Sequence, residues 1–259
     1  MGRNAERKKV FFSKHPMCCF CGGSVMATTE DHIPARSLFL RRKWPEGYVF
    51  PACERCNQSS RLDELLMAAS VRIRVRDFRS QEEEDELEHA LSNFQRKLPH
   101  VFKKLKELTR VETRRNLRER GIHQTSFPGI GELYIVEIPE EVHQATVRYG
   151  EKLGKALHYM HTGRIIPSTG ALYSYPFTNG VNIPTDVIEK ALVVLPGQSI
   201  TKRDHTLLDG QFAYRYGVVD SGEASAYFTV FGESLSILIL AVMDSVAFEK
   251  RRAERHEAA

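Results

Sequence analysis

Two Cys-x-x-Cys pairs constrain the fold of this chain more than any other feature of its sequence. Cys18 and Cys21 form the first pair, and Cys53 and Cys56 form the second about 30 residues later. Four thiolates are enough to close a tetrahedral zinc site, and a closed site is structural because no ligand position stays open. A Gly-Gly dipeptide follows the first pair, where a tight turn needs residues that tolerate positive φ. The spacing therefore predicts a zinc-stapled module whose folding depends on the metal.

The five cysteines of the chain all lie between positions 18 and 56. A secreted protein held by disulfides would spread its cysteines more widely, so this clustering favours metal binding in a reducing compartment. Cys19 is the unpaired fifth cysteine. It is an alternative ligand to Cys18, although the two-residue spacing to Cys21 favours Cys18.

The composition is that of a soluble globular protein. Of the 259 residues, 42% are hydrophobic and 27% are charged, which allows one or two domains with a sizeable core. No apolar run approaches the roughly 20 residues that span a bilayer. The basic first residues are not followed by the apolar segment of a secretory signal. We therefore expect a cytoplasmic protein that does not act in the membrane.

Positive charge is concentrated at the N-terminus. Residues 1–62 hold 11 Lys and Arg against 5 Asp and Glu, although the whole chain carries a net charge of only +4. A basic module suggests a polyanionic partner such as nucleic acid. A solvated basic surface with no partner is the alternative.

The pattern of apolar residues predicts an α+β fold with two units. A small zinc-stapled module occupies residues 1–62, and a helical segment followed by a mixed α/β domain with an antiparallel sheet occupies residues 63–259. Helices are expected at 61–78, 81–98, 101–121 and 139–163, and strands at 131–138, 191–196, 211–219 and 225–244. The alternating VRIRVR at 71–76 is compatible with a strand, but continuation of the helix is favoured. Residues 1–15 and 248–259 are polar and are expected to be irregular or frayed.

Between the two cysteine pairs lies the sequence TTEDHIPARSLF, and directly after the last cysteine comes Asn57. The strings CCFCGG, TEDHIPARSLF and VFPACERCNQSSRLDELL together resemble the HNH endonuclease family, over residues 18–66 or about a quarter of the chain. The resemblance implies a ββα-metal module with Asp31 and His32 on a strand and Asn57 at the start of the helix.

The resemblance also implies roles for these side chains in phosphodiester hydrolysis. His32 would activate the water, as a neutral histidine can near pH 7. Asp31 and Asn57 would hold a catalytic Mg²⁺ or Mn²⁺ through oxygen ligands. Apart from the resemblance, Arg36, Arg55 and Arg61 are candidates for contacts with phosphates of DNA, with RNA as an open alternative, although an arginine taken alone is more often a surface charge.

Two features complicate this picture. Adjacent residues on a strand point to opposite faces, so Asp31 and His32 share a direction only if the chain bends, and Pro34 is placed to enforce a turn. The family also has a middle Asn that orients the loop of the base, and no Asn occurs between His32 and Asn57. Glu46 and Tyr48 lie in the corresponding region, but the sequence does not assign this role to either.

The sequence leaves two classes of function open. One is a metal-dependent endonuclease, which by analogy with other free-standing HNH proteins would act in restriction or anti-phage defence. The other is a zinc-stabilised module that binds nucleic acid or protein without chemistry. In either case residues 63–259 could recognise a target, form a homodimer or dock a partner such as an ATPase.

Overall fold

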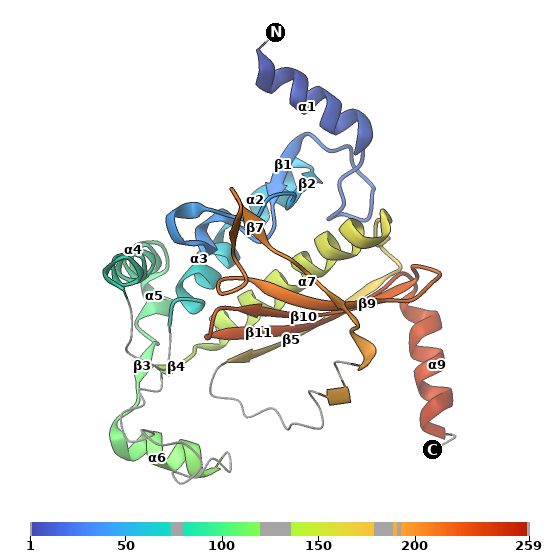
Figure 1. The fold of residues 1–259 in the computed structure, drawn as a ribbon. Helices are drawn as coiled ribbons and strands as arrows, with labels where there is room; N and C mark the ends of the chain where they lie inside the picture. Colours follow the sequence, from blue (N-terminus) through green and yellow to red (C-terminus); the bar gives the residue numbers. More distant parts are fainter. Residues whose placement is uncertain (1, 74–79, 120–135, 179–188, 191–192, 258–259) are drawn as a thin grey trace.

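The computed structural model describes residues 2–73, 80–119, 136–178, 189–190 and 193–257 of the chain. Within these ranges the protein is α+β, and its strands pair in antiparallel fashion (Figure 1). The helices are α1 (Arg3–Lys14), α2 (Glu54–Ser59), α3 (Arg61–Ser70), α4 (Gln81–Lys97), α5 (Pro99–Phe102), α6 (Arg110–Glu119), α7 (Glu140–Thr162) and α9 (Ser245–Glu257), with short 3₁₀ turns η1 (Arg36–Leu38) and η2 (Leu40–Arg42). The strands are β1 (Thr29–His32), β2 (Val49–Ala52), β3 (Lys106–Glu107), β4 (Val136–Glu137), β5 (Ala171–Thr178), β6 (Gly197–Gln198), β7 (Lys202–Arg203), β8 (Thr206–Leu207), β9 (Ala213–Val218), β10 (Ala224–Phe231) and β11 (Leu235–Val242).

A small two-stranded sheet and a helix form the N-terminal module. β1 pairs with β2, with Thr29 opposite Ala52 and His32 opposite Val49. β2 leads directly into Cys53 and helix α2, so the second cysteine pair joins the sheet to the helix. The module therefore has the order strand, strand, helix.

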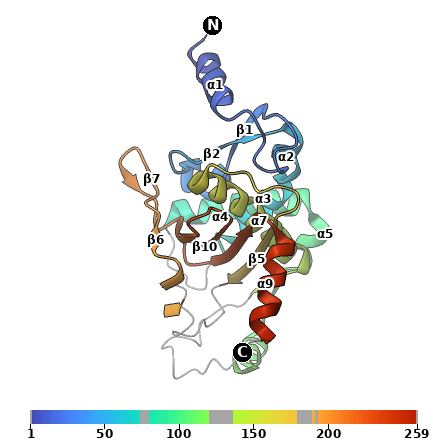
Figure 2. The ribbon, with the colours of Figure 1, turned by 90° about the vertical axis from the view of Figure 1, so that its right-hand side faces the viewer.

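The larger part of the protein is a five-stranded sheet in the order β5-β11-β10-β9-β6. Alternate residues of β10 and β11 are buried, as expected for a sheet with one covered face. Helix α7 covers that face, which Figure 2 shows from the side. The helix approaches closely because it has glycine at the contact: a Cβ on Gly154 would lie 2.6 Å from a methyl group of Ile239. The helix ends at Gly163, whose φ of 68° is the left-handed conformation of a C-terminal cap.

One hydrophobic core joins the N-terminal module to the sheet. Buried residues of the module such as Ile33 and Phe50 belong to the same cluster as Leu153 on α7 and Ile237 on β11. A second, smaller cluster lies between α3, α4, α5 and α7 and is centred on Phe94. The boundary that we expected near residue 62 falls inside α3, and burial is continuous across it.

Several sequence predictions of local structure are wrong. Residues 3–14 and 245–257 are helical rather than irregular. The helix expected over 101–121 is broken after α5, because residues 106–107 pair with β4 before α6 begins. The first helix ends at Ser70 instead of continuing, while 74–78 of the predicted helix lie outside the described residues. Val193 and Val194, which were expected in a strand, are helical. The other predictions that fall outside the described residues concern 120–121, 131–135, 191–192 and 258–259.

The strands β10 and β11, the strand β9 and the helix α7 are where the sequence placed them. Strand β5 and the short hairpin β7–β8 were not anticipated. Among the helices that the structure describes, none is long and apolar enough to cross a membrane.

Candidate functional site

The four cysteines of the two pairs meet at one point. The sulfur atoms of Cys18, Cys21, Cys53 and Cys56 all lie within 4.8 Å of one another. Gly22 and Gly23 have φ of 71° and 72°, as the knuckle turn requires. The cluster can therefore hold a metal ion, and four thiolates at this spacing are the donor set that zinc prefers.

Cys19 does not join this cluster. Its side chain is fully buried, and burial, together with the neighbouring Cys18 thiol and the Asp31 carboxylate, raises the pKa of Cys19 far above its usual value. Cys19 is not among the four cysteines whose sulfur atoms lie close enough together to hold one ion. The ligand ambiguity between Cys18 and Cys19 is resolved in favour of Cys18.

Asp31 and His32 lie on the same strand but have different neighbours. The carboxylate of Asp31 is buried and forms an ion pair with Lys152 of α7, with 2.6 Å between Oδ2 and Nζ. The same ammonium donates to the hydroxyl of Ser60 and lies 3.6 Å from the carboxylate of Glu64. Lys152 is thus surrounded by oxygen atoms from β1 and from the α2–α3 junction, and it ties the N-terminal module to α7.

Replacing Lys152 by methionine should strongly destabilise the protein. Both side chains of the Asp31–Lys152 pair are nearly buried, at 6% and 11% exposed. Removing one partner leaves an uncompensated buried charge, which typically costs about 3–5 kcal/mol. Urea unfolding of Lys152→Met should show this loss, and the double variant Asp31→Asn with Lys152→Met should recover a large part of it.

Lys155→Met is the matched control for that experiment. Lys155 lies one turn further along α7 and donates to the backbone carbonyl of Phe20 instead of pairing with an acid. Its replacement should cost clearly less than that of Lys152. Equal losses in the free energy of unfolding for both lysine variants would show that the ion pair with Asp31 does not stabilise the protein more than the hydrogen bond of Lys155 does.

His32 lies among cationic and aromatic side chains. Its Nε2 is 2.6 Å from Nη2 of Arg36, and its ring makes an edge contact with Trp44 at 5.0 Å between centroids. An arginine can only donate, so Nε2 of His32 is the acceptor and carries no proton. Arg36 and Trp44 thus orient the ring.

Burial and the charge of Arg36 lower the pKa of His32 to about 4, while Glu30 partly opposes this change. The imidazole is therefore neutral at physiological pH. A neutral imidazole with an unprotonated Nε2 is the form that accepts a proton. Beyond β1 the chain bends at the cis Ile33–Pro34 bond.

Asn57 lies within α2, which already begins at Glu54, and so not at the start of the helix as expected. Its side-chain amide donates to Oγ1 of Thr29 at 3.1 Å and to the carbonyl of Glu30 at 3.4 Å. Asp31 contacts Lys152 instead, so this geometry does not join Asp31 and Asn57 as a ligand pair. Their binding of a common Mg²⁺ or Mn²⁺ stays a prediction.

Of the three predicted phosphate-binding arginines, Arg36 lies beside His32, whereas Arg55 and Arg61 are exposed on α2 and α3. Sequence reasoning missed Arg203, whose guanidinium lies 4.0 Å from the centre of the Trp44 ring. It also missed Lys152. Neither lies in a motif, and each is brought to the module by the tertiary fold alone.

A pair of histidines on α7, His158 and His161, lies beneath the sheet and apart from this site. His158 is fully buried and shares a hydrogen bond of 2.8 Å with Ser225, and His161 stacks on Tyr216. Burial, followed by the charge of Arg164 and of His161, lowers the pKa of His158 to about 4. These contacts are those of core side chains.

The depressed pKa of His158 makes stability depend on pH. Unfolded histidine titrates near 6.5, so on acidification the unfolded chain binds a proton that folded His158 does not take up until about pH 4. The contribution of His158 to the free energy of unfolding is therefore complete above pH 6.5, and it is lower by about 2 kcal/mol at pH 5. Urea unfolding at pH 7.5 and 5 should show a smaller pH effect for His158→Gln than for the wild type. An unchanged pH effect would contradict the assignment; the exposed His143→Gln is the control.

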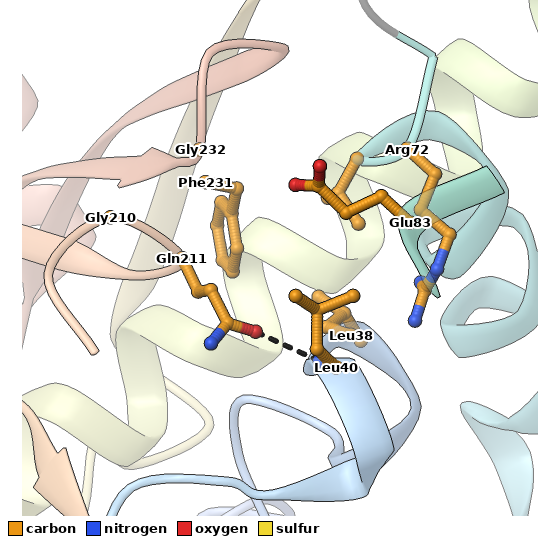
Figure 3. Close-up of a pocket in the computed structure, with 9 residues that line it drawn as sticks. Leu38, Leu40, Arg72, Glu83, Gly210, Gln211, Phe231 and Gly232 are labelled. Atoms are coloured by element: carbon orange, nitrogen blue, oxygen red, sulfur yellow. Dashed lines mark hydrogen bonds between the residues drawn. The ribbon is translucent and has the colours of Figure 1, made fainter. Parts of the chain in front are cut away.

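Two cavities lie away from His32. Figure 3 shows a cavity of about 50 Å³ between η1–η2, the α3–α4 region and the tip of the sheet, where Leu40 N–H donates to Gln211. This volume is far below that of a ligand pocket. The second, of about 750 Å³, lies between α9 and the end of the sheet and is lined by residues such as Val242 and Phe248. Neither of these two cavities is lined by His32.

Comparison of the chain with protein-family models, with curated proteins and with solved structures gave no match.

Proposed function

We propose that this protein is an endonuclease that hydrolyses phosphodiester bonds of DNA, with His32 as the general base. The observation that carries the proposal is the neutral His32 with its unprotonated Nε2 among arginines, at the end of the strand in a cysteine-closed ββα unit. The resemblance of residues 18–66 to HNH endonucleases supports the same reaction.

The arginines near His32 give the site its affinity for phosphate. Arg36 contacts His32, and Arg203, Arg7 and Arg42 lie close enough to influence the pKa of His32 or of Arg36. Glu30 opposes this charge and is itself paired with Arg7 at 2.7 Å. A phosphate is a stronger partner for a guanidinium than a neutral imidazole is. Substrate binding would therefore draw Arg36 towards the phosphate and free Nε2 of His32.

The chemical step then follows from simple acid-base requirements. Water attacks phosphorus while one of its protons passes to Nε2 of His32. The bond from phosphorus to the leaving oxygen breaks with its electron pair going to that oxygen, which takes up a proton from solvent water. The guanidinium groups stabilise the charge on the phosphorane oxygens. A Mg²⁺ or Mn²⁺ would supply further charge stabilisation, although the carboxylate of Asp31 is paired with Lys152.

A zinc-stabilised binding module without chemistry is the second candidate. It is favoured by the fact that Asp31 is already paired with Lys152 and His32 with Arg36. In that case the same basic surface would bind nucleic acid without cleaving it. A role in restriction or anti-phage defence, and docking of a second copy or an ATPase through residues 63–259, are extensions of the nuclease proposal.

Cleavage of four substrates distinguishes the two candidates. Purified full-length protein is incubated with supercoiled plasmid, linear duplex, single-stranded DNA and RNA, with Mg²⁺, with Mn²⁺ and with EDTA, and its zinc content is measured afterwards. The proposal expects cleavage of DNA, and the EDTA samples that retain zinc show whether a divalent ion is required. Binding without cleavage of any substrate would support the second candidate instead.

A further inference from the structure

The short hairpin β7–β8 reaches from the sheet to the N-terminal module. Its two strands are joined by Asp204 and His205, which both have positive φ, as in the tightest hairpin turns. Figures 1 and 2 show β7, in orange, extending away from the main sheet towards β1 and β2. The hairpin therefore carries residues of the C-terminal part towards His32.

Three hydrogen bonds fix this hairpin to the loop before β2. The N–H of Glu46 donates to the carbonyl of Lys202 at 3.0 Å, and the carboxylate of Glu46 accepts from the N–H of Asp204 at 3.0 Å. Nη1 of Arg203 donates to the carbonyl of Trp44 at 3.1 Å. The position of Arg203 is thus determined by backbone contacts on both sides.

Arg203 and Arg36 both stack on Trp44. Their guanidinium carbons lie 4.0 Å and 3.9 Å from the centre of the ring. One face of an indole has room for only one guanidinium at this distance, so the two arginines occupy opposite faces. Each stack is favourable as a cation–π contact, but it brings two like charges together on one side chain.

Among the described residues, the acids near these two arginines are Glu30, which is paired with Arg7, and Asp204. Nε of Arg36 is buried and has no hydrogen-bond partner among the described residues. The acid that contacts Arg203 is its neighbour Asp204, at 3.7 Å and largely exposed. A buried unpaired donor within a cluster of arginines is the feature expected of a phosphate-binding surface without its ligand.

We propose that Arg203 and Arg36, held on the two faces of Trp44, contact neighbouring phosphates of one nucleic-acid strand and so place the bond to be cut at His32. The inference rests on the proposed nuclease function and adds that the substrate site is composite. The N-terminal module supplies Arg36 and Trp44, and the hairpin of the C-terminal part supplies Arg203. Arg203 acts as a substrate-positioning residue.

The single tryptophan of the chain makes this proposal directly measurable, because all tryptophan emission comes from Trp44. Full-length zinc-loaded protein is titrated with inorganic phosphate and with a short single-stranded DNA in Ca²⁺ buffer. Emission should change on addition of either, and sodium chloride at equal ionic strength is the control. An emission spectrum that DNA does not change would overturn the proposal.

Binding of a fluorescein-labelled oligonucleotide by variants gives the second readout. Arg203→Ala should weaken binding about ten-fold, as expected for loss of a charge-assisted phosphate contact. It should also reduce the slope of log K against log salt by about 1. Lys202→Ala is the matched control, since it removes the same charge from an exposed side chain of the same hairpin. It should weaken binding no more than about two-fold.

The readouts separate this inference from the nuclease proposal. Equal binding and equal salt slopes for Arg203→Ala and Lys202→Ala would overturn the role of Arg203, whether or not the wild type cleaves DNA. Binding that depends on Arg203 in a protein that cleaves nothing would refute the nuclease proposal alone. Arg203→Lys keeps the charge but loses the planar fork, so it should give intermediate affinity if the contact is bidentate.

Discussion

Replacing Cys53 by serine is expected to remove the metal and unfold the N-terminal module. Cys53 is one of the four clustered thiols, and it also lies at the junction between β2 and α2. Apparent binding free energies of structural zinc in small domains are about 10–16 kcal/mol, which far exceeds the stability that so small a unit has alone. The zinc content measured by metal analysis should be about one ion per chain in the wild type, because four thiolates bind one ion, and none in the variant.

The loss should extend beyond the module, because Cys18, Cys53 and Ile33 belong to the same core as Leu153 and Ile237. We therefore expect Cys53→Ser to lower the urea midpoint of the whole protein and its soluble yield. Cys19→Ala is the matched control, since Cys19 is a neighbouring buried thiol outside the cluster. It should keep its zinc. A folded wild-type protein that contains no metal would refute the zinc assignment.

The local parts of the site could be predicted from the sequence. The spacing of the cysteine pairs indicated that Cys18, Cys21, Cys53 and Cys56 share one site, and their sulfur atoms do meet. Helix α7 could be predicted from its apolar spacing and from Gly163, since a glycine with positive φ ends it. Strands were expected over 225–244 in an antiparallel sheet, and β10 and β11 do pair there in antiparallel fashion.

The parts of the site that come from distant segments could not be predicted. Lys152 meets Asp31 because the tertiary fold brings α7 to the N-terminal module, and no periodicity encodes which helix residue faces a given acid. Arg203 reaches Trp44 through a two-residue turn made by Asp204 and His205, and these residue types adopt positive φ only occasionally. α1 was missed because its first two turns are polar and exposed, as in an irregular terminus.

The orientation of Asp31 and His32 could be predicted only in part from the sequence. Strand alternation predicted that adjacent residues would face different surroundings, and they contact Lys152 and Arg36 respectively. The resemblance to HNH endonucleases predicted that Asp31 and Asn57 share a metal site. Asn57 contacts Thr29 and Glu30 instead, so the shared site stays a prediction. The ion pair of Asp31 depends on a residue outside the resembling segment.

His32→Ala should abolish most of the cleavage activity while leaving the fold intact. Loss of a general base typically lowers the rate by about 10²–10⁴-fold. The side chain is half-buried and contacts Arg36 and Trp44, but it lies outside the cysteine cluster and outside the Asp31–Lys152 ion pair. Arg36 keeps its stack on Trp44 in the variant. Zinc content and the urea midpoint should therefore change little.

The most direct test of the account is the single-turnover rate of plasmid cleavage by zinc-loaded wild type, His32→Ala and His143→Ala, with zinc content measured on the same samples. His143 is exposed on α7 and serves as the control for loss of a histidine. The account predicts a rate at least about 100-fold lower for His32→Ala only, with unchanged zinc. Cleavage by His32→Ala at the wild-type rate would contradict it.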